Sequence, residues 1–514
     1  MSNQSNSKDN KRLAKNTLFL YFRMFITLVV GLYTSRVVLN VLGVTDYGIY
    51  NVLGGIVAIF ATLNSAMAST SSRYITYYLG CGDDKRLKQI FSTVSFVHLA
   101  IAVIVILACE TVGLWFFYNH MSIPAERMDV AFWLLQFSFA ASFLSMINIP
   151  YTSLIIAREN MSIYAYISIF DVTMKLLIVF LIRISPVDKL LSYGFLILLV
   201  HIADFLLYRC YCIRKYTESH LMLFFDKPLF KELSSYFGWS IFGNLAGAFN
   251  TQGVNLLLNV FFGPAVNAAR GIAVQVQNII NQFVGNFQIA LNPQIIKTYA
   301  NNDLQRMHKL MFASAKYGFL LLFLLSLPVM IEARYILELW LGIVPEHTVN
   351  FIRIILISCM INALANSSTV AAGATGKIRA YSMVVGGFVL LPLPFAYFLL
   401  KIVAHPELVF LVVLLFEIVA LFLRLLFMRK MVFMSIKEYA VQVIVPSISV
   451  VVCSLCIPVA LYALLPQTFF NVLIVIASCL MATLLFVYAI GLKHNERVFV
   501  LNLIKNKIVH HKEV

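Results

Sequence analysis

Residues 407–430 read ELVFLVVLLFEIVALFLRLLFMRK, and this run decides the class of fold. Glu417 and Arg424 are the only charged side chains between its first residue and the closing Arg429 and Lys430. A helix that crosses a membrane needs about 20 mostly apolar residues. The run therefore predicts a transmembrane helix with two charged side chains inside the hydrocarbon.

Similar apolar runs follow one another along almost the whole chain. Of its 514 residues, 61% are hydrophobic and 12% are charged, whereas a soluble protein has about a quarter of its residues charged. We predict an all-α polytopic membrane protein with about 14 transmembrane helices. The predicted spans are residues 16–42, 47–79, 89–117, 128–157, 161–184, 190–212, 233–262, 266–297, 309–331, 348–374, 379–402, 407–430, 439–464 and 469–492.

The basic residues between the spans give the orientation. With the N-terminus inside, the inside segments hold 26 Lys and Arg residues and the outside segments hold five. Such an excess is typical of cytoplasmic loops. We therefore predict a multi-pass protein of the cytoplasmic membrane with both termini in the cytoplasm.

The chain also repeats itself at a separation of about 220 residues. Asp83 and Arg86 correspond to Asp303 and Arg306, and Ile123-Pro124 corresponds to Val344-Pro345. Six spans per unit keep the orientation the same, so the repeats are parallel, as in many transporters. The predicted organisation is a tail (1–15), an N-lobe (16–212), a linker (213–232), a C-lobe (233–430), two extra C-terminal spans (431–492) and a second tail (493–514).

Amide side chains form stripes in the seventh and eighth spans. In the eighth span, one helix face holds Asn267, Arg270, Gln277, Asn281, Gln288 and Asn292. In the seventh, a similar stripe holds Ser240, Asn244, Thr251, Asn255 and Asn259. Unpaired amides are costly in hydrocarbon. They therefore either bind neighbouring helices or line a water-filled cavity, and their number favours the cavity.

Eight basic residues lie inside spans: Arg23, Arg36, Arg73, Lys175, Arg270, Lys316, Arg353 and Arg424. We expect Arg36, Arg353 and Arg424 to extend toward the lipid headgroups; Lys316 and Arg73 fit that role or a cavity equally well. Arg23, Arg73 and Arg270 would make a cavity cationic, which favours an anion bearing hydroxyl groups. The candidate substrate-binding residues are Arg23, Arg73, Arg270, Asn255, Gln277, Asn281 and Gln288.

Three acidic residues, Asp171, Asp204 and Glu417, are candidates to couple transport to a proton or sodium ion. Asp171 is also placed to form an ion pair with Lys175, four residues later on the same helix, and the sequence leaves both roles open. No nucleotide-binding loop, catalytic motif or metal-ligand spacing is present. We therefore expect no enzyme activity, cofactor, metal or nucleic-acid partner, with energy from an ion gradient, the membrane potential or the substrate gradient.

Several segments resemble one known family. These are TSRVVLNVLGVTDYGIY (34–50), SRYIT (72–76) with Gly82-Asp83, NAARGIA (267–273) and PQIIK (293–297). They look like the O-antigen and capsule repeat-unit flippases, which are polysaccharide biosynthesis membrane proteins of the multidrug/oligosaccharidyl-lipid/polysaccharide exporter superfamily. The resemblance covers roughly residues 10–430.

The resemblance implies a V-shaped, two-lobed transporter in a bacterial inner membrane. Its cargo would be an undecaprenyl-diphosphate-linked oligosaccharide, moved from the inner to the outer leaflet for lipopolysaccharide or capsule synthesis. Related flippases hold the diphosphate with arginines on the first and eighth helices, which Arg23 and Arg270 match here. Membrane lipids are the expected surroundings, polysaccharide-assembly enzymes are candidate partners, and a monomer is expected to suffice. The rival functions are an ion-coupled multidrug exporter of the same superfamily and a membrane glycan polymerase or ligase.

Overall fold

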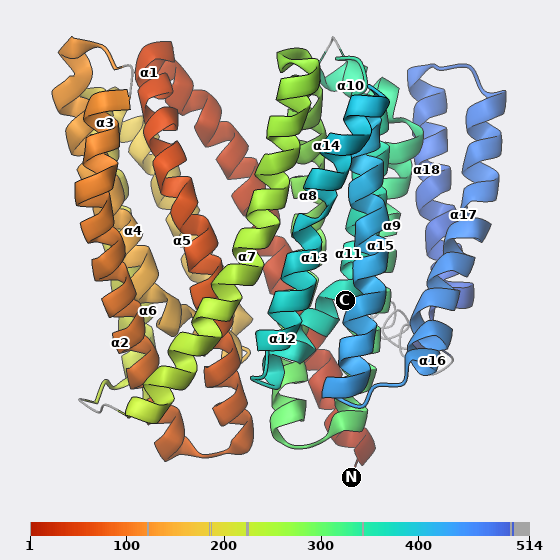
Figure 1. Cartoon of the computed structure of the whole chain (residues 1–514), viewed down its shortest axis with the longest axis horizontal. Helices are drawn as coiled ribbons and strands as arrows, with labels where there is room; N and C mark the ends of the chain where they lie inside the picture. Colours follow the sequence, from red (N-terminus) through yellow and green to blue (C-terminus); the bar gives the residue numbers. More distant parts are fainter. Residues whose placement is uncertain are drawn as a thin grey trace, which may run out of the picture. The chain divides into compact units, whose positions relative to one another are not determined.

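The structure is a computed structural model, and it describes residues 2–120, 123–184, 186, 188–222, 226–341, 344–493, 496 and 497. The described chain is almost entirely helical and contains no strand, which confirms the predicted all-α class (Figure 1). The side chains of Arg36 and Asn259 and most of the predicted tail after residue 493 lie outside the described residues.

The longer helices run along the chain in order. They are α1 (Ser2–Cys81), α2 (Asp84–Ala108), α4 (Met128–Ala157), α5 (Met161–Arg183), α6 (Lys189–Lys215), α7 (Lys227–Phe262), α8 (Pro264–Ala300), α9 (Leu304–Ile331), α11 (Thr348–Ala374), α14 (Pro392–Ile402), α15 (Glu407–Met431), α17 (Val445–Leu464) and α18 (Phe469–Phe486). The short helices are α3 (Leu114–His120), α10 (Ala333–Leu341), α12 (Arg379–Tyr381), α13 (Gly387–Leu390) and α16 (Ile436–Tyr439). Single π-helical turns lie at Cys109–Gly113, Ser382–Gly386, Ala440–Ile444 and Val487–Gly491, and 3₁₀ turns at Ala125–Arg127 and Thr217–Ser219.

The observed helices agree closely with the predicted spans. Helices α4 and α11 begin and end at the predicted residues. Ten helical runs among the described residues are long and apolar enough to cross a membrane, and they correspond to the third to sixth and ninth to fourteenth predicted spans. Helices α7 and α8 match the seventh and eighth spans.

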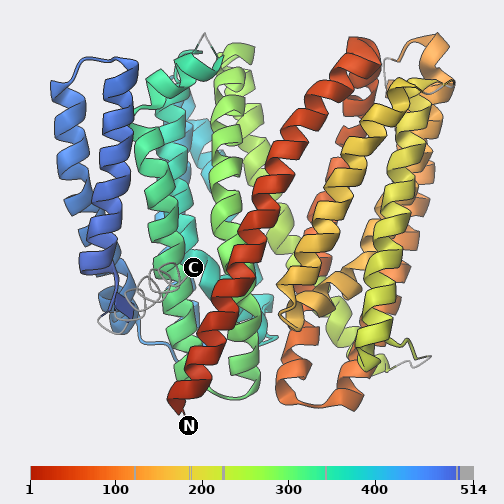
Figure 2. The ribbon, with the colours of Figure 1, turned by 180° about the vertical axis from the view of Figure 1, so that it is seen from behind.

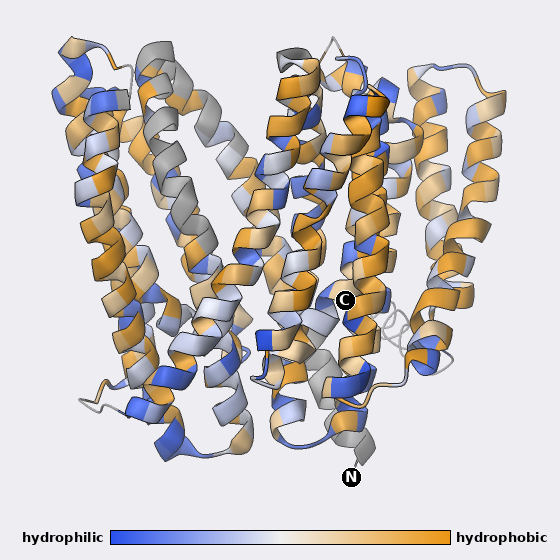
Figure 3. Ribbon diagram, in the orientation of Figure 1, coloured by the Kyte–Doolittle hydropathy of each residue, from blue (hydrophilic) through white to orange (hydrophobic). Residues whose placement is uncertain are grey.

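The first two predicted spans belong to one element, α1. Its ribbon rises from the N-terminus and then returns, so that it forms two arms (Figure 2). Hydrophobic residues run along helices such as α15 and α17, while hydrophilic residues gather where helices are joined (Figure 3). This distribution is what a helix bundle needs when its solvent is lipid.

The predicted internal repeat has matching local structure in both halves. The Arg86 N–H donates to Asp83 Oδ1 at 3.0 Å, and the Arg306 N–H donates to Asp303 Oδ1 at 3.0 Å. Both aspartates therefore cap the helix that follows, α2 and α9. Similarly, the carbonyl oxygens of Pro124 and Pro345 each accept a hydrogen bond from the residue three positions later.

The chain divides into two compact units that are interleaved in the sequence. Unit 1 comprises residues 1–248, 289–307 and 373–386, and unit 2 comprises residues 249–288, 308–372 and 387–514. In unit 1, α4 packs against α1, α2 and α6 around fully buried side chains such as Leu135 and Met146. In unit 2, α14 packs against α15, and α17 packs against α18.

One helix, α10, was not predicted, since its residues were assigned to an outside loop. It has nine residues, too few for the span-length criterion. Leu337 is buried, while Leu339 and Trp340 are exposed, and Arg334 pairs with Glu338 at 2.9 Å on its polar side. This amphipathic pattern is typical of a helix that lies in the membrane interface.

Candidate functional site: one polar pocket in each compact unit

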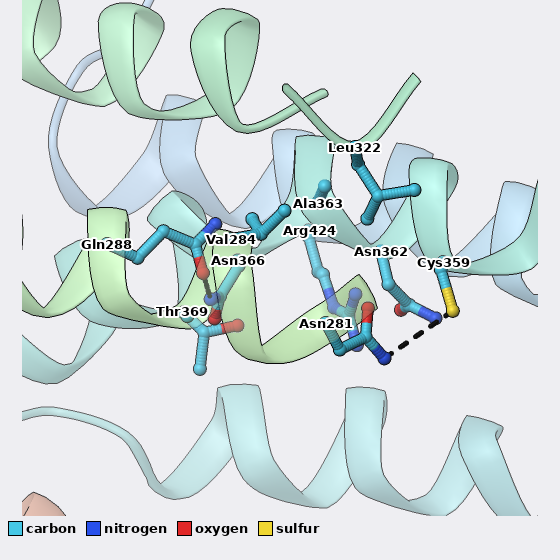
Figure 4. A pocket seen from close by; sticks show the side chains of 11 residues that line it. Asn281, Val284, Gln288, Leu322, Cys359, Asn362, Ala363, Asn366, Thr369 and Arg424 are labelled. Carbon is cyan, nitrogen blue, oxygen red and sulfur yellow. Dashed lines mark hydrogen bonds between the residues drawn. The ribbon is translucent and has the colours of Figure 1, made fainter. Parts of the chain in front are cut away.

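Unit 2 contains a polar pocket of about 330 Å³ between α8, α9, α11 and α15 (Figure 4). Four amide side chains and one guanidinium dominate its wall. The lining residues are Asn281, Val284, Gly285, Gln288, Leu322, Cys359, Asn362, Ala363, Asn366, Thr369 and Arg424.

The spacing of polar residues along α11 explains why they share this wall. Cys359, Asn362, Asn366 and Thr369 follow one another at intervals of three or four residues, which places them on one helix face. Sequence reasoning missed this stripe, although the same spacing rule that found Asn281 and Gln288 on α8 would have found it. Those two candidates line the pocket; their contact with substrate stays a prediction.

Part of the polar wall is satisfied by bonds between α8 and α11. Gln277 Nε2 and Asn281 Nδ2 donate to Cys359 Sγ, at 3.2 and 3.5 Å, and Asn366 Nδ2 donates to Gln288 Oε1. The two explanations for the amide stripe therefore hold together in unit 2, because the amides join helices and also line a cavity.

The two charges of α15 have different surroundings. Glu417 is half-buried, and its carboxylate accepts hydrogen bonds from Ser358 and from Asn362 Nδ2, the latter at 2.7 Å. Arg424 lies about two helical turns later and lines the pocket. The expectation that Arg424 extends to the headgroups is therefore wrong, because α15 turns this face toward α8 and α11.

The other candidates of unit 2 lie outside the pocket wall. Arg270 Nη2 donates to the carbonyl oxygen of Thr251 at 2.8 Å, so it ties the beginning of α8 to α7. Asn255 is half-buried on α7. Two further basic residues have protein partners: Lys316 lies 3.4 Å from Glu496, and Arg353 Nε donates to the carbonyl oxygen of Met330 at 2.9 Å.

Unit 1 contains a second polar pocket, of about 210 Å³, between α4, α5 and α6. Each helix contributes polar residues spaced by three or four positions, which places them on one face. The lining residues are Leu144, Ser145, Asn148, Ile149 and Thr152 of α4, Asp171 and Lys175 of α5, and His201, Asp204 and Tyr208 of α6.

The unit 1 pocket holds two of the three coupling candidates. Lys175 Nζ lies 2.8 Å from Asp171 Oδ1, which confirms the predicted ion pair. Asp204 lines the same pocket, close enough to Asp171 and Lys175 for its charge to interact with theirs. With both carboxylates and Lys175 charged, the three groups have one excess negative charge. The pocket can therefore accept a proton or a small monovalent cation.

The remaining arginine candidates of unit 1 are bound by protein groups. Arg73 is 7% exposed; its Nε and Nη2 donate to the carbonyl oxygens of Gly373 and Ala374 at 3.2 and 3.4 Å. Its guanidinium lies 4.2 Å from the ring centroid of Tyr74. Gly376 has φ +75°, and a Cβ there would lie 2.4 Å from Arg73 Nη2. This environment anchors segments far apart in the sequence, whereas a substrate role for Arg73 stays a prediction. Arg23 lies 4.8 Å from the ring centroid of Tyr164.

A motif residue, Asp46, has a structural partner. Arg127 forms ion pairs with both Asp46 and Asp188. Burial opposes ionisation of Asp188, but hydrogen bonds from the backbone N–H groups of Leu191 and Leu190 and from Arg127 together hold the pKa of this carboxyl below its usual value. Among the described residues, no cluster of three or more His, Cys, Asp or Glu side chains could hold a metal ion.

No protein-family model matches the sequence, and no curated protein matches it either. Solved structures do match. A multidrug resistance MATE family transporter of the MOP superfamily, in an outward-facing conformation, has a TM-score of 0.73 at 12% identity, covering 82% of this chain and 96% of that chain. A MATE protein in a bent conformation has a TM-score of 0.73 at 12% identity, covering 82% and 95%.

A third match is a MOP superfamily transporter from Pyrococcus furiosus, for which a reversed polarity of the binding pocket suggests a different function. Its TM-score is 0.71 at 12% identity, and the match covers 82% of this chain and 96% of that chain. At such low identity the likeness establishes the fold alone. The chain therefore has the fold of the MATE transporters.

Proposed function

We propose that the protein is a flippase that moves an undecaprenyl-diphosphate-linked oligosaccharide from the inner to the outer leaflet of a bacterial cytoplasmic membrane. Transport would proceed by alternating access, for the synthesis of O-antigen or capsule. The proposal includes cytoplasmic termini, membrane lipids as surroundings, polysaccharide-assembly enzymes as possible partners, a single copy as the working unit and no enzymatic step.

The observation that supports this proposal most strongly is the chemistry of the unit 2 pocket. Among the described residues, four amides, a threonine and a guanidinium line it, and no carboxylate does. Amides form hydrogen bonds with sugar hydroxyls in both directions, because each has a donor and an acceptor. An organic cation would be repelled by Arg424 and would leave the amides unpaired. Arg23 and Arg270 remain the proposed ligands of the diphosphate, by resemblance.

A multidrug exporter is the second candidate function. Two of the matched structures are named as MATE proteins, and one of these is named as a multidrug resistance transporter. The acidic unit 1 pocket, with Asp171 and Asp204, would suit an organic cation as well as a coupling ion. Which of the two functions is correct therefore depends on which pocket binds the transported substrate.

For the flippase, we propose that the unit 1 pocket takes up the coupling ion. Its excess negative charge would be neutralised by a proton or sodium ion. Glu417 is the third candidate, but its carboxylate already accepts two hydrogen bonds, which favours Asp171 and Asp204.

Transport in proteoliposomes tests the proposal. A fluorescent undecaprenyl-diphosphate oligosaccharide and a cationic dye are compared for the wild type, Arg270→Ala and Arg353→Ala. Arg353 is the matched control, since it is another arginine within a span of unit 2 and already donates to Met330. We expect the sugar lipid to move, the Arg270→Ala rate to fall at least about tenfold through loss of a charged contact, and the control to keep its rate.

Movement of the dye along an ion gradient, without movement of the sugar lipid, would instead establish the multidrug exporter. Arg270→Lys separates a loss of charge from a loss of folding, because lysine keeps the charge and can still reach the Thr251 carbonyl. A sugar-lipid rate that is equal in the wild type and Arg270→Ala would remove Arg270 from the proposed site.

A further inference from the structure

Arg424 is a charged group inside the helix bundle, and it lines the unit 2 pocket. Among the described residues it forms no ion pair and no hydrogen bond. A charged side chain within a membrane span must face a partner or water. The guanidinium is therefore a group with which a negatively charged guest of this pocket can pair.

The acid closest in sequence does not fill this role. Glu417 lies on the same helix, but both of its carboxylate oxygens accept hydrogen bonds from α11, one from Ser358 and one from Asn362. The carboxylate is thus hydrogen-bonded by two neutral side chains of α11, and it attracts Arg424 without forming an ion pair with it. The guanidinium remains available to the space that it lines.

A second donor in the same pocket is also unpaired. Gln288 is 5% exposed; its Oε1 accepts from Asn366, while its Nε2 is buried without a partner. Figure 4 shows Gln288 and Arg424 among the side chains that line the pocket. The pocket wall is thus rich in hydrogen-bond donors, which favours a guest rich in acceptors.

The other residues of the pocket wall restrict the chemical class of the ligand further. Asn281, Asn362, Asn366 and Thr369 offer amide and hydroxyl groups, which suit a guest with several hydroxyls. The volume of about 330 Å³ is at the lower end of the range for small-ligand pockets, so one sugar ring fits better than an oligosaccharide. A single guanidinium matches one carboxylate in a two-bond arrangement, whereas a diphosphate would call for several cations.

From these observations, we propose that the unit 2 pocket binds one acidic sugar residue, such as a hexuronic acid. Arg424 would receive the carboxylate, and the amides and Thr369 would receive the hydroxyls. This inference rests on the proposed flippase function, and it makes Arg424 the residue that selects acidic over neutral cargo.

The inference is tested with two lipid-linked oligosaccharides. They have the same lipid carrier, the same diphosphate and the same length, and they differ in one sugar, which is glucose in one and glucuronate in the other. The measured quantity is the ratio of acidic to neutral lipid transported by proteoliposomes in competition. We expect the wild type to prefer the acidic lipid about tenfold or more, as one charged hydrogen-bonded pair allows. Arg424→Gln should bring the ratio close to one, Arg424→Lys should give an intermediate ratio, and Arg353→Gln should keep the wild-type ratio.

A wild-type ratio of one, or a preference that survives in Arg424→Gln, would overturn the inference while the flippase function stands. If neither lipid is transported, the flippase proposal fails. A direct binding measurement then tests whether the unit 2 pocket binds an acidic sugar. Free glucuronate, glucose and inorganic diphosphate are titrated separately into the purified full-length protein. Glucuronate binding that weakens at least tenfold in Arg424→Gln supports the pocket; equal binding of glucose, or loss of diphosphate binding alone, refutes it.

Discussion

The two polar pockets are built alike and charged oppositely. Each lies within one compact unit and takes polar side chains at intervals of three or four residues from several helices, including α4 in unit 1 and α11 in unit 2. These helices correspond to the fourth spans of the two predicted repeats. In unit 1, the base Lys175 is paired with Asp171; in unit 2, the base Arg424 is unpaired. The same framework therefore provides an acceptor-rich pocket in one unit and a donor-rich pocket in the other.

The difference indicates which charged side chains stabilise the fold and which are available to bind a ligand. A paired base supports the protein without ligand, and removal of its partner leaves a buried charge uncompensated. An unpaired base contributes no such stability, and it can be removed without loss until a ligand arrives. Stability measurements on the protein without ligand can therefore separate the two roles.

The largest expected effect is on stability. We expect Asp171→Leu to lower the free energy of unfolding by about 1.5–3 kcal/mol, since it removes the charged hydrogen bond to Lys175 and leaves Asp204 as the remaining carboxylate of that pocket. Arg424→Leu should leave the stability of the ligand-free protein unchanged or higher. Unfolding of the detergent-purified protein measures both. Equal destabilisation by Arg424→Leu would mean that unit 2 supplies a partner for Arg424 after all.

A smaller effect is expected on coupling. Asp204→Asn removes one of the two carboxylates of the unit 1 pocket, so the acceleration of transport by a proton or sodium gradient should fall at least about fivefold, within the usual range of coupling energies. The measurement compares transport with and without an imposed gradient. Glu110→Gln is the control, because Glu110 accepts a hydrogen bond from Gln136 at 3.1 Å and lies in neither pocket. An undiminished gradient response in Asp204→Asn would leave Asp171 and Glu417 as the coupling candidates.

The smallest effect is expected outside both pockets, at Asp188. Its folded-state pKa is held below the usual value, so its contribution is complete above the unfolded pKa of about 4 and is lost as the pH falls through the folded pKa. Because the pair with Arg127 is partly exposed, we expect less than about 1 kcal/mol. Melting temperatures of the wild type and Asp188→Asn should differ at pH 6 and converge near pH 3. A difference that persists at pH 3 would assign the effect to packing.

The sequence predicted the helices well, since long apolar runs separated by charged turns mark membrane spans directly. The limits of α4 and α11 were correct to the residue. Helix α10 was not predicted, because its nine residues are too few for a membrane span. The π-helical turns were not predicted either, since a π-helical turn adds one residue to a helix and leaves the apolar composition of the span unchanged.

The site was only partly predictable, because periodicity identifies a helix face but not the helix that lies opposite. The stripe on α8 gave Asn281 and Gln288, but the facing stripe on α11 and the approach of Arg424 depend on how α15 packs. In the same way, Asp171 and Lys175 were found as neighbours on one helix. The addition of His201 and Asp204 to their pocket required the packing of α5 against α6.

The interleaving of the two units has a consequence for how genes of this fold can recombine. The chain passes from one unit to the other inside α7, between residues 248 and 249, and again inside α8, between residues 288 and 289. A single crossover between two related genes anywhere from residue 249 to 386 would therefore join fragments of both units from different parents. The lining residues of the two pockets nevertheless lie in separate stretches, residues 144–208 and 281–424. A crossover between residues 249 and 280 therefore moves each pocket lining as a whole, but it leaves both units with a framework of mixed origin.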